Sequence, residues 1–137
     1  MSRITLSSGG TKSAPVPIGT WDNLRTALDN LRNEFQGQNI LIRLQNESGD
    51  ELMVGFGSTT GTATITAASG TIVSIALNTS DGKRQRGDKF HWGPHTFDVD
   101  AQSLISISDV YLIAKQWMAD GTLSENVKWD TSNHPLP

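Results

Sequence analysis

Two histidines near the middle of the chain have a spacing that metal sites use. His91 and His95 lie four residues apart, as the two ligands of a helical zinc pair do. A Gly-Pro dipeptide lies between them, and a helix does not continue through it because proline lacks an amide hydrogen and clashes with the preceding turn. A hairpin would still bring the imidazoles together, but no spacing selects a third ligand among Asp98, Asp100 and His134. We therefore expect no metal ion and no other cofactor.

Asp98 and Asp100 are candidates for a pair of carboxylates that act together. Residues two apart in a strand share one face, where two ionised acids repel each other unless a cation lies between them. A solvated strand end fits this pattern better than a catalytic dyad or an ion site. A cationic protein partner would relieve the same repulsion.

Motifs of common catalytic sites are missing from the sequence. It contains no G-x-S-x-G nucleophile turn, no P-loop and no H-E-x-x-H. The closely spaced glycines near the middle of the chain precede strand-like residues, so they do not open a nucleotide-binding helix. We predict that the protein is not an enzyme. The catalytic alternative is a site built from His91, His95, Asp98 and Asp100.

A short basic segment precedes two aromatic residues. Lys83, Arg84 and Arg86 come before Phe90 and Trp92, a combination that single-stranded nucleic-acid sites use. The segment is short, and neighbouring aspartates nearly neutralise it. We therefore expect a solvated loop and no nucleic-acid partner.

Three tryptophans differ in their surroundings. Trp117 lies on the apolar face of a predicted helix and Trp129 in the last predicted strand, so we expect both in the core. Trp92 lies in a Gly/Pro turn, and it is the aromatic residue best suited to an interface.

Length and composition fit one soluble domain spanning residues 1–137. A chain of this size buries roughly two thirds of the surface that it exposes when unfolded, and it contains no cysteine for disulfides or thiolate sites. The first residues lack the charged and apolar regions of a secretory signal. No apolar stretch approaches the roughly 18 residues of a membrane-spanning helix. We expect a cytoplasmic protein with no membrane partner.

Acidic residues are concentrated in the last third of the chain. The net charge is -3, which gives no basic excess of the kind that nucleic-acid binding requires. Lys115 and Lys128 are outnumbered after residue 96 by Asp98, Asp100, Asp109, Asp120, Glu125 and Asp130. If these carboxylates share one surface, they would steer a cationic partner toward it.

Short segments rich in β-branched residues alternate with turn residues. We expect a strand near Ile4–Leu6, followed by a flexible Ser/Gly/Pro connection over residues 7–19, where Pro15 and Pro17 disfavour regular pairing. Residues 79–89 are expected to form a long exposed turn. The other strands predict an antiparallel meander. They cover residues 39–44, 51–56, 62–67 and 71–77, with shorter strands at 90–92, 96–99 and 126–130.

Two segments have helical periodicity. The first is capped by Thr20 and ends near Gly37, and its apolar residues are Leu24, Ala27, Leu28, Leu31 and Phe35. The second follows Ser108, begins with Asp109 and ends before Gly121, and its apolar residues are Val110, Ile113, Ala114, Trp117 and Met118. We predict an α+β fold in which two amphipathic helices pack on one face of an antiparallel β-meander sheet. A C-terminal Trp-containing strand completes the sheet, and the tail at residues 131–137 frays.

The end of the chain resembles the first-numbered immunity-protein family of bacterial polymorphic toxin systems. That family ends with an Ile-Pro dipeptide that opens a helix containing an Ala and an aromatic residue. A Gly follows, then a Pro a few residues on, and then a hydrophobic-x-Trp strand. The matching residues are Ile105, Ala114, Trp117, Gly121, Val127 and Trp129. Ser106 and Ser124 stand where prolines are common in the family.

This resemblance implies a protein that binds a cognate toxin C-terminal domain, of nuclease or deaminase type, and covers its active site. It transfers no toxin-contacting residue. The acidic last third suits a cationic toxin, and we predict Trp92, His95, Asp98 and Asp100 as toxin-binding residues.

A structural or assembly protein is the alternative to an immunity protein. The Thr/Ala/Gly-rich strand at residues 60–70 has small side chains that suit close approach of sheets in a homo-oligomer. A homodimer of the free protein is compatible with an immunity protein and with an assembly protein.

Overall fold

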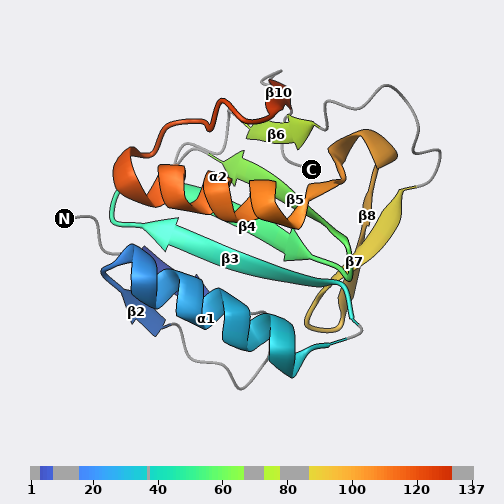
Figure 1. Cartoon of the computed structure of the whole chain (residues 1–137), viewed down its shortest axis with the longest axis horizontal. Coiled ribbons are helices and arrows are strands. Elements are labelled where there is room, and N and C mark those ends of the chain that lie inside the picture. Colours follow the sequence, from blue (N-terminus) through green and yellow to red (C-terminus); the bar gives the residue numbers. More distant parts are fainter. Residues whose placement is uncertain (1–3, 8–15, 37, 67–72, 78–86, 131–137) are drawn as a thin grey trace.

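The computed structural model describes residues 4–7, 16–36, 38–66, 73–77 and 87–130. Strands come first and last in this part of the chain, and two helices of equal length interrupt them (Figure 1). In chain order the elements are β1 (Ile4–Ser7), β2 (Val16–Ile18), α1 (Trp21–Glu34), β3 (Ile40–Asn46), β4 (Glu51–Phe56), β5 (Thr60–Thr66), β6 (Val73–Leu77), β7 (Asp88–Trp92), β8 (His95–Val99), the 3-10 helix η1 (Ala101–Ser103), β9 (Ile105–Ser106), α2 (Ile107–Asp120) and β10 (Lys128–Asp130).

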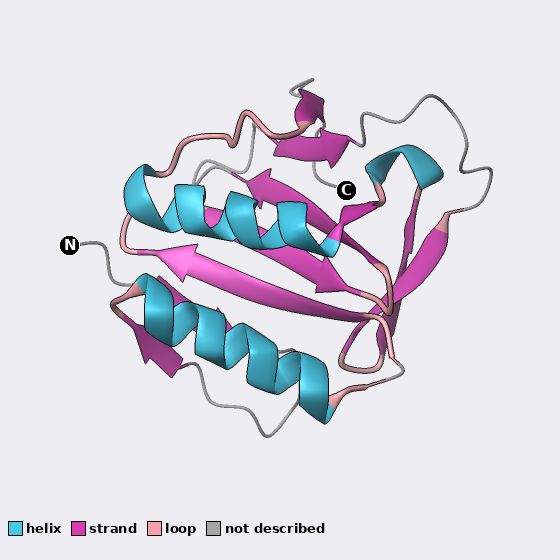
Figure 2. Ribbon diagram, in the orientation of Figure 1, coloured by secondary structure: helices cyan, strands magenta, loops and turns pink. Residues whose placement is uncertain are grey.

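One mostly antiparallel sheet contains these strands, in the order β10-β6-β5-β4-β3-β1-β2. The run from β3 to β6 pairs each strand with the next one in sequence, which confirms the predicted meander (Figure 2). The predicted C-terminal strand is also confirmed, because β10 pairs antiparallel with β6 and places Trp129 opposite Ala76. The short β9 pairs with β5, and β7 makes one parallel bridge to β3 and pairs with β8.

Part of the predicted flexible connection is a strand. Residues 16–18 form β2, which pairs antiparallel with β1 and places Pro17 opposite Thr5. The expectation that the prolines prevent pairing is therefore wrong for these residues. β2 lies at the end of the strand order, and an edge strand tolerates proline because its outward side needs no amide hydrogen. Residues 8–15 and the predicted fraying tail at 131–137 lie outside the described residues.

Both helices lie on one face of the sheet, as predicted (Figure 1). α1 buries Leu24 and Leu28, and α2 buries five apolar side chains, including Trp117. These side chains meet alternate residues of the strands, since successive side chains of a strand point to opposite faces. The main contributors from the sheet are Ile42, Leu44, Leu52, Val54, Phe56 and Ala63. Trp129 packs against the same core.

A second, smaller core lies on the opposite face of the sheet. Leu41, Phe90 and Leu104 form it, and Trp92 is one of the partly buried residues packed against them. Leu41 alternates along β3 with residues of the main core, so the two cores lie on opposite sides of that strand. The β7–β8 hairpin therefore packs on the sheet face that the helices leave uncovered.

The helix ends follow from side-chain capping. Thr20 caps α1 as predicted, accepting a hydrogen bond from the Asn23 amide at 3.2 Å. α2 begins two residues earlier than predicted, because the Ser106 hydroxyl, not that of Ser108, accepts the Asp109 amide at 3.1 Å. Gly121 ends α2 with φ 74°, a conformation that glycine adopts without steric cost.

Replacing the capping serine tests this assignment. We expect Ser106→Ala to lower the free energy of unfolding by about 1 kcal/mol, because one amide at the start of α2 loses its partner. Ser108→Ala is the matched control, since Ser108 is exposed and within the helix, and its effect should stay within about 0.5 kcal/mol. Urea unfolding followed by circular dichroism measures both. Equal effects of the two substitutions would contradict the assignment.

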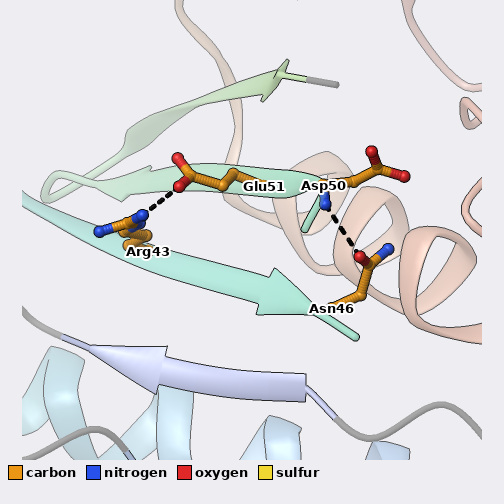
Figure 3. Close-up of polar contacts among 4 residues, drawn as sticks. All are labelled: Arg43, Asn46, Asp50 and Glu51. Atoms are coloured by element: carbon orange, nitrogen blue, oxygen red, sulfur yellow. Dashed lines mark hydrogen bonds and ion pairs between the residues drawn. The ribbon is translucent and has the colours of Figure 1, made fainter. Parts of the chain in front are cut away.

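Polar contacts link the two central strands β3 and β4 near their turn. Figure 3 shows Arg43 of β3 and Glu51 of β4 pointing toward each other, and their side chains form an ion pair. At the turn, the Asp50 amide donates to the side-chain oxygen of Asn46 at 2.9 Å. Both contacts join residues that are close in sequence across the β3–β4 turn, so the hairpin is specified locally.

Candidate functional site

The β7–β8 hairpin projects at one end of the sheet, where β3 begins (Figure 1). The His91 amide donates to the carbonyl oxygen of Asn39 at 2.8 Å, and the Asn39 side-chain amide donates to the Lys89 carbonyl at 2.9 Å. Phe90 is fully buried beneath the hairpin. One buried ring and two hydrogen bonds thus attach the base of the hairpin to the sheet, while β8 faces outward.

Two of the predicted site residues face each other at the tip of this hairpin. Trp92 and His95 are directly opposite in the β7–β8 register, on either side of the Gly93-Pro94 turn. His95 is exposed, whereas Trp92 is half-buried against the smaller core. The structure therefore brings this pair together and leaves Trp92 partly exposed.

The two predicted carboxylates lie further along the hairpin. Asp98 is exposed on β8 directly opposite Lys89, so this acid already has a cationic neighbour. Asp100 is also exposed, but β8 ends at Val99 and Asp100 lies beyond it, before η1. The backbone of Asp100 is still extended, but Asp100 has no partner in the β7–β8 register, so the register places only Asp98 on a face of the hairpin.

Phe97 is the residue of this surface that the sequence reasoning missed. It lies on β8 opposite the buried Phe90, yet it is 50% exposed. One sequence feature could have identified Phe97 as a surface residue. It is a single aromatic residue between Thr96 and Asp98, in a short strand next to a Gly-Pro turn. We define the hairpin surface as Trp92, His95 and Phe97, which share one face of the hairpin, together with Asp98 on its other face and Asp100 just beyond β8.

The two histidines do not form a metal pair. His91 is opposite Thr96 and His95 is opposite Trp92, so the imidazoles project from opposite faces of the hairpin. Within the described ranges, no group of three His, Cys, Asp or Glu side chains is arranged to hold a metal ion. The basic segment at residues 83–86 lies outside the described part of the chain.

The acidic residues of the last third are distributed over several elements. Asp109 and Asp120 are at the two ends of α2 and so lie about 16 Å apart along its axis. Glu125 follows the helix, and Asp130 belongs to β10. Of these acids, Asp98 and Asp100 lie at the hairpin, where Lys89 is directly opposite Asp98.

A polar cluster joins the two helices on the other face of the sheet. The Tyr111 hydroxyl of α2 donates to the Asp29 carboxylate of α1 and accepts from Arg32 Nη1 at 3.2 Å. The Arg32 guanidinium lies 5.4 Å from the centre of the Phe56 ring. A groove of about 410 Å³ opens beside Asp29, Arg32 and Phe56. Because these groups bond one another, the cluster mainly ties α1 to α2.

Titration of Tyr111 tests this cluster. Burial raises the pKa of the Tyr111 hydroxyl above its usual 10.0, and the hydrogen bond to Asp29 adds to the rise, while Arg32 opposes it. The folded protein therefore holds this proton more tightly than the unfolded chain does. The Tyr111 hydroxyl contributes its full share to the free energy of unfolding below the usual pKa of 10.0. That contribution is lost as the pH rises through the higher pKa of the folded protein. Tyr111 is the one tyrosine in the sequence.

Ultraviolet absorbance of the tyrosinate therefore reports Tyr111 directly. We expect a titration midpoint above 10.0 in the folded protein, and a lower one in denaturant. Tyr111→Phe should reduce the loss of stability in alkali. A folded midpoint at or below that of the denatured chain would contradict the cluster.

Comparison with known proteins decides the family. The sequence profile of the family described as Immunity protein Imm1 matches residues 12–131. The chain belongs to this family. The Imm1 match extends from before β2 to just after β10 and includes the whole hairpin surface. The resemblance inferred from the helix and the Trp strand at the end of the chain is thereby confirmed.

Membership of the Imm1 family gives the chain an immunity-protein role, which implies a toxin as its partner and indicates a non-enzymatic activity. No curated protein matches the chain. In the part of the chain that the structure describes, neither helix has the length and apolar character needed to cross a membrane.

Proposed function

We propose that this Imm1 protein acts in the bacterial cytoplasm, where it binds the C-terminal domain of a cognate toxin and covers its active site or substrate channel. The family resemblance makes a nuclease- or deaminase-type domain the expected toxin, and carboxylates on the immunity protein would then take the place of substrate phosphates. The Imm1 match over residues 12–131 carries this proposal.

The hairpin surface is the proposed contact with the toxin. It combines an exposed aromatic ring, Phe97, with the accessible part of Trp92 and two exposed carboxylates. Aromatic residues at the centre of an interface supply much of its binding energy, and charged residues around them steer the approach of the partner. The hairpin joins the sheet mainly at β7, so its outer strand is sterically accessible.

Co-expression tests the proposed function. The full chain is expressed in cells together with the toxin domain encoded by the neighbouring gene, and growth and co-purification are measured. We expect growth to be restored and a complex to be isolated. A toxin domain that still kills the cells and does not co-purify with the chain would show that the proposal is wrong.

Charge reversal tests the electrostatic part. We expect Asp98→Lys combined with Asp100→Lys to slow association with the toxin domain about tenfold or more at low salt, with a smaller effect at high salt. Glu47→Lys combined with Glu125→Lys is the matched control, because it changes the net charge equally at exposed positions away from the hairpin. Stopped-flow or surface-binding kinetics provide the rates. Equal rates for the two double variants would remove Asp98 and Asp100 from the interface.

A further inference from the structure

We infer that the toxin adds an extended segment to the outer edge of β8, so that recognition continues the sheet of the immunity protein. This inference rests on the proposed function and specifies how the hairpin surface contacts the toxin. The occupant is a strand of the toxin in which an apolar residue and a basic residue are adjacent.

The hydrogen bonds of β7 show which backbone groups of β8 point outward. The His91 amide and the Lys89 carbonyl are bonded to Asn39, on the side of β7 away from β8. In an antiparallel pair of strands, some opposed residues form no hydrogen bond with each other. The amide and carbonyl groups of both residues in such a pair point away from the partner strand. Thr96 is opposite His91 and Asp98 is opposite Lys89. The amides and carbonyls of Thr96 and Asp98 therefore face the outer edge.

This edge is open within the described part of the chain. β8 pairs there with β7 alone, and its residues are exposed except for the half-buried Val99. β2 and β10, at the two ends of the strand order, have three residues each, whereas β8 has five. Native proteins commonly protect sheet edges by keeping them short or placing proline in them, as β2 does with Pro17. β8 is therefore a longer edge strand than β2 or β10, and it contains no proline.

The side chains of β8 specify the chemistry of the added strand. Phe97 lies on the same face of the hairpin as the buried Phe90, so an apolar residue added beside it would extend the smaller core and cover the exposed half of the ring. Asp98 lies on the other face, with Lys89 on its inner side. A basic residue of the toxin strand would supply a cation on its outer side.

Residue-resolved hydrogen exchange distinguishes strand addition from other modes of contact. The probe is the catalytically inactivated toxin domain encoded next to the chain, bound to the full-length protein. We expect the Thr96 and Asp98 amides to exchange fast in the free protein and at least about tenfold more slowly in the complex. The Phe97 amide bonds to β7 and should already exchange slowly in both states. This alternation is the signature of backbone pairing.

Two pairs of variants supply an independent measurement. Thr96→Pro removes the outward amide donor, whereas Thr96→Val keeps it, and edge strands tolerate proline on their open side. We expect the toxin dissociation constant to rise about tenfold or more for Thr96→Pro and to change little for Thr96→Val. Phe97→Ala should raise it about 30-fold, while Leu123→Ala, at another exposed apolar position after α2, should not.

The outcomes separate this inference from the proposed function. If the toxin domain neither binds nor is neutralised, the proposed function fails and strand addition fails with it. If a neutralised complex forms while the Thr96 and Asp98 amides exchange as fast as in the free protein, only strand addition is wrong. Protection of those amides in the free protein that rises with its concentration would identify a second copy of the chain as the occupant, and would also overturn the inference.

Discussion

Replacing Trp117 with alanine is expected to lower the free energy of unfolding by about 3 to 5 kcal/mol. Trp117 is 2% exposed and lies in the core formed by α2, α1 and the sheet. Removing the indole loses the free energy of burying its apolar surface and leaves a cavity that the surrounding side chains fill only in part. The change is a large fraction of the roughly 5 to 15 kcal/mol by which domains are stable.

Equilibrium unfolding in urea measures this effect. Leu112→Ala is the matched control, because Leu112 belongs to the same helix but is 44% exposed. Its effect should stay within about 0.5 kcal/mol, since helix propensity is nearly unchanged and little buried surface is lost. If the two substitutions destabilise the protein equally, Trp117 does not have the core position that the structure gives it.

The core position of Trp117 is also what the sequence could predict. Apolar residues recurring at helical spacing from Val110 to Met118 define one face of α2, and the structure buries that face. The β-meander was predicted for a similar reason, since turn residues at regular intervals separate strands that pair with their neighbours in sequence. These features depend on residues that are close along the chain.

Features that depend on distant residues were not predicted. The sequence predicts that Pro17 prevents pairing, because it does not show that the strand containing Pro17 lies at the edge of the sheet. The exposure of Phe97 depends on Phe90, opposite it, filling the small core over Leu41, a contact between segments far apart in sequence. The sequence therefore located the hairpin and its polar residues, but it did not identify the aromatic side chain that dominates the hairpin surface.

The smaller core also makes Gly55 a position where one methyl group is expected to affect stability and binding together. A Cβ atom at Gly55 would lie 2.6 Å from Thr62 Cγ2 and 2.9 Å from Phe90 Cδ2, both closer than real Cβ contacts allow. We expect Gly55→Ala to lower the free energy of unfolding by about 1 to 3 kcal/mol through overpacking. Because Phe90 is fully buried under the hairpin, its displacement moves the hairpin surface.

Gly19→Ala separates this steric effect from the general effect of replacing glycine. A Cβ atom at Gly19 meets nothing within 4 Å, so that variant should be unchanged or more stable by up to about 1 kcal/mol, because alanine restricts the unfolded chain. Urea unfolding and toxin binding are measured for both variants. We expect Gly55→Ala alone to weaken toxin binding, about tenfold, at temperatures where it remains folded. If Gly55→Ala lowers stability but leaves the affinity for the toxin unchanged, the smaller core supports the fold without positioning the hairpin surface.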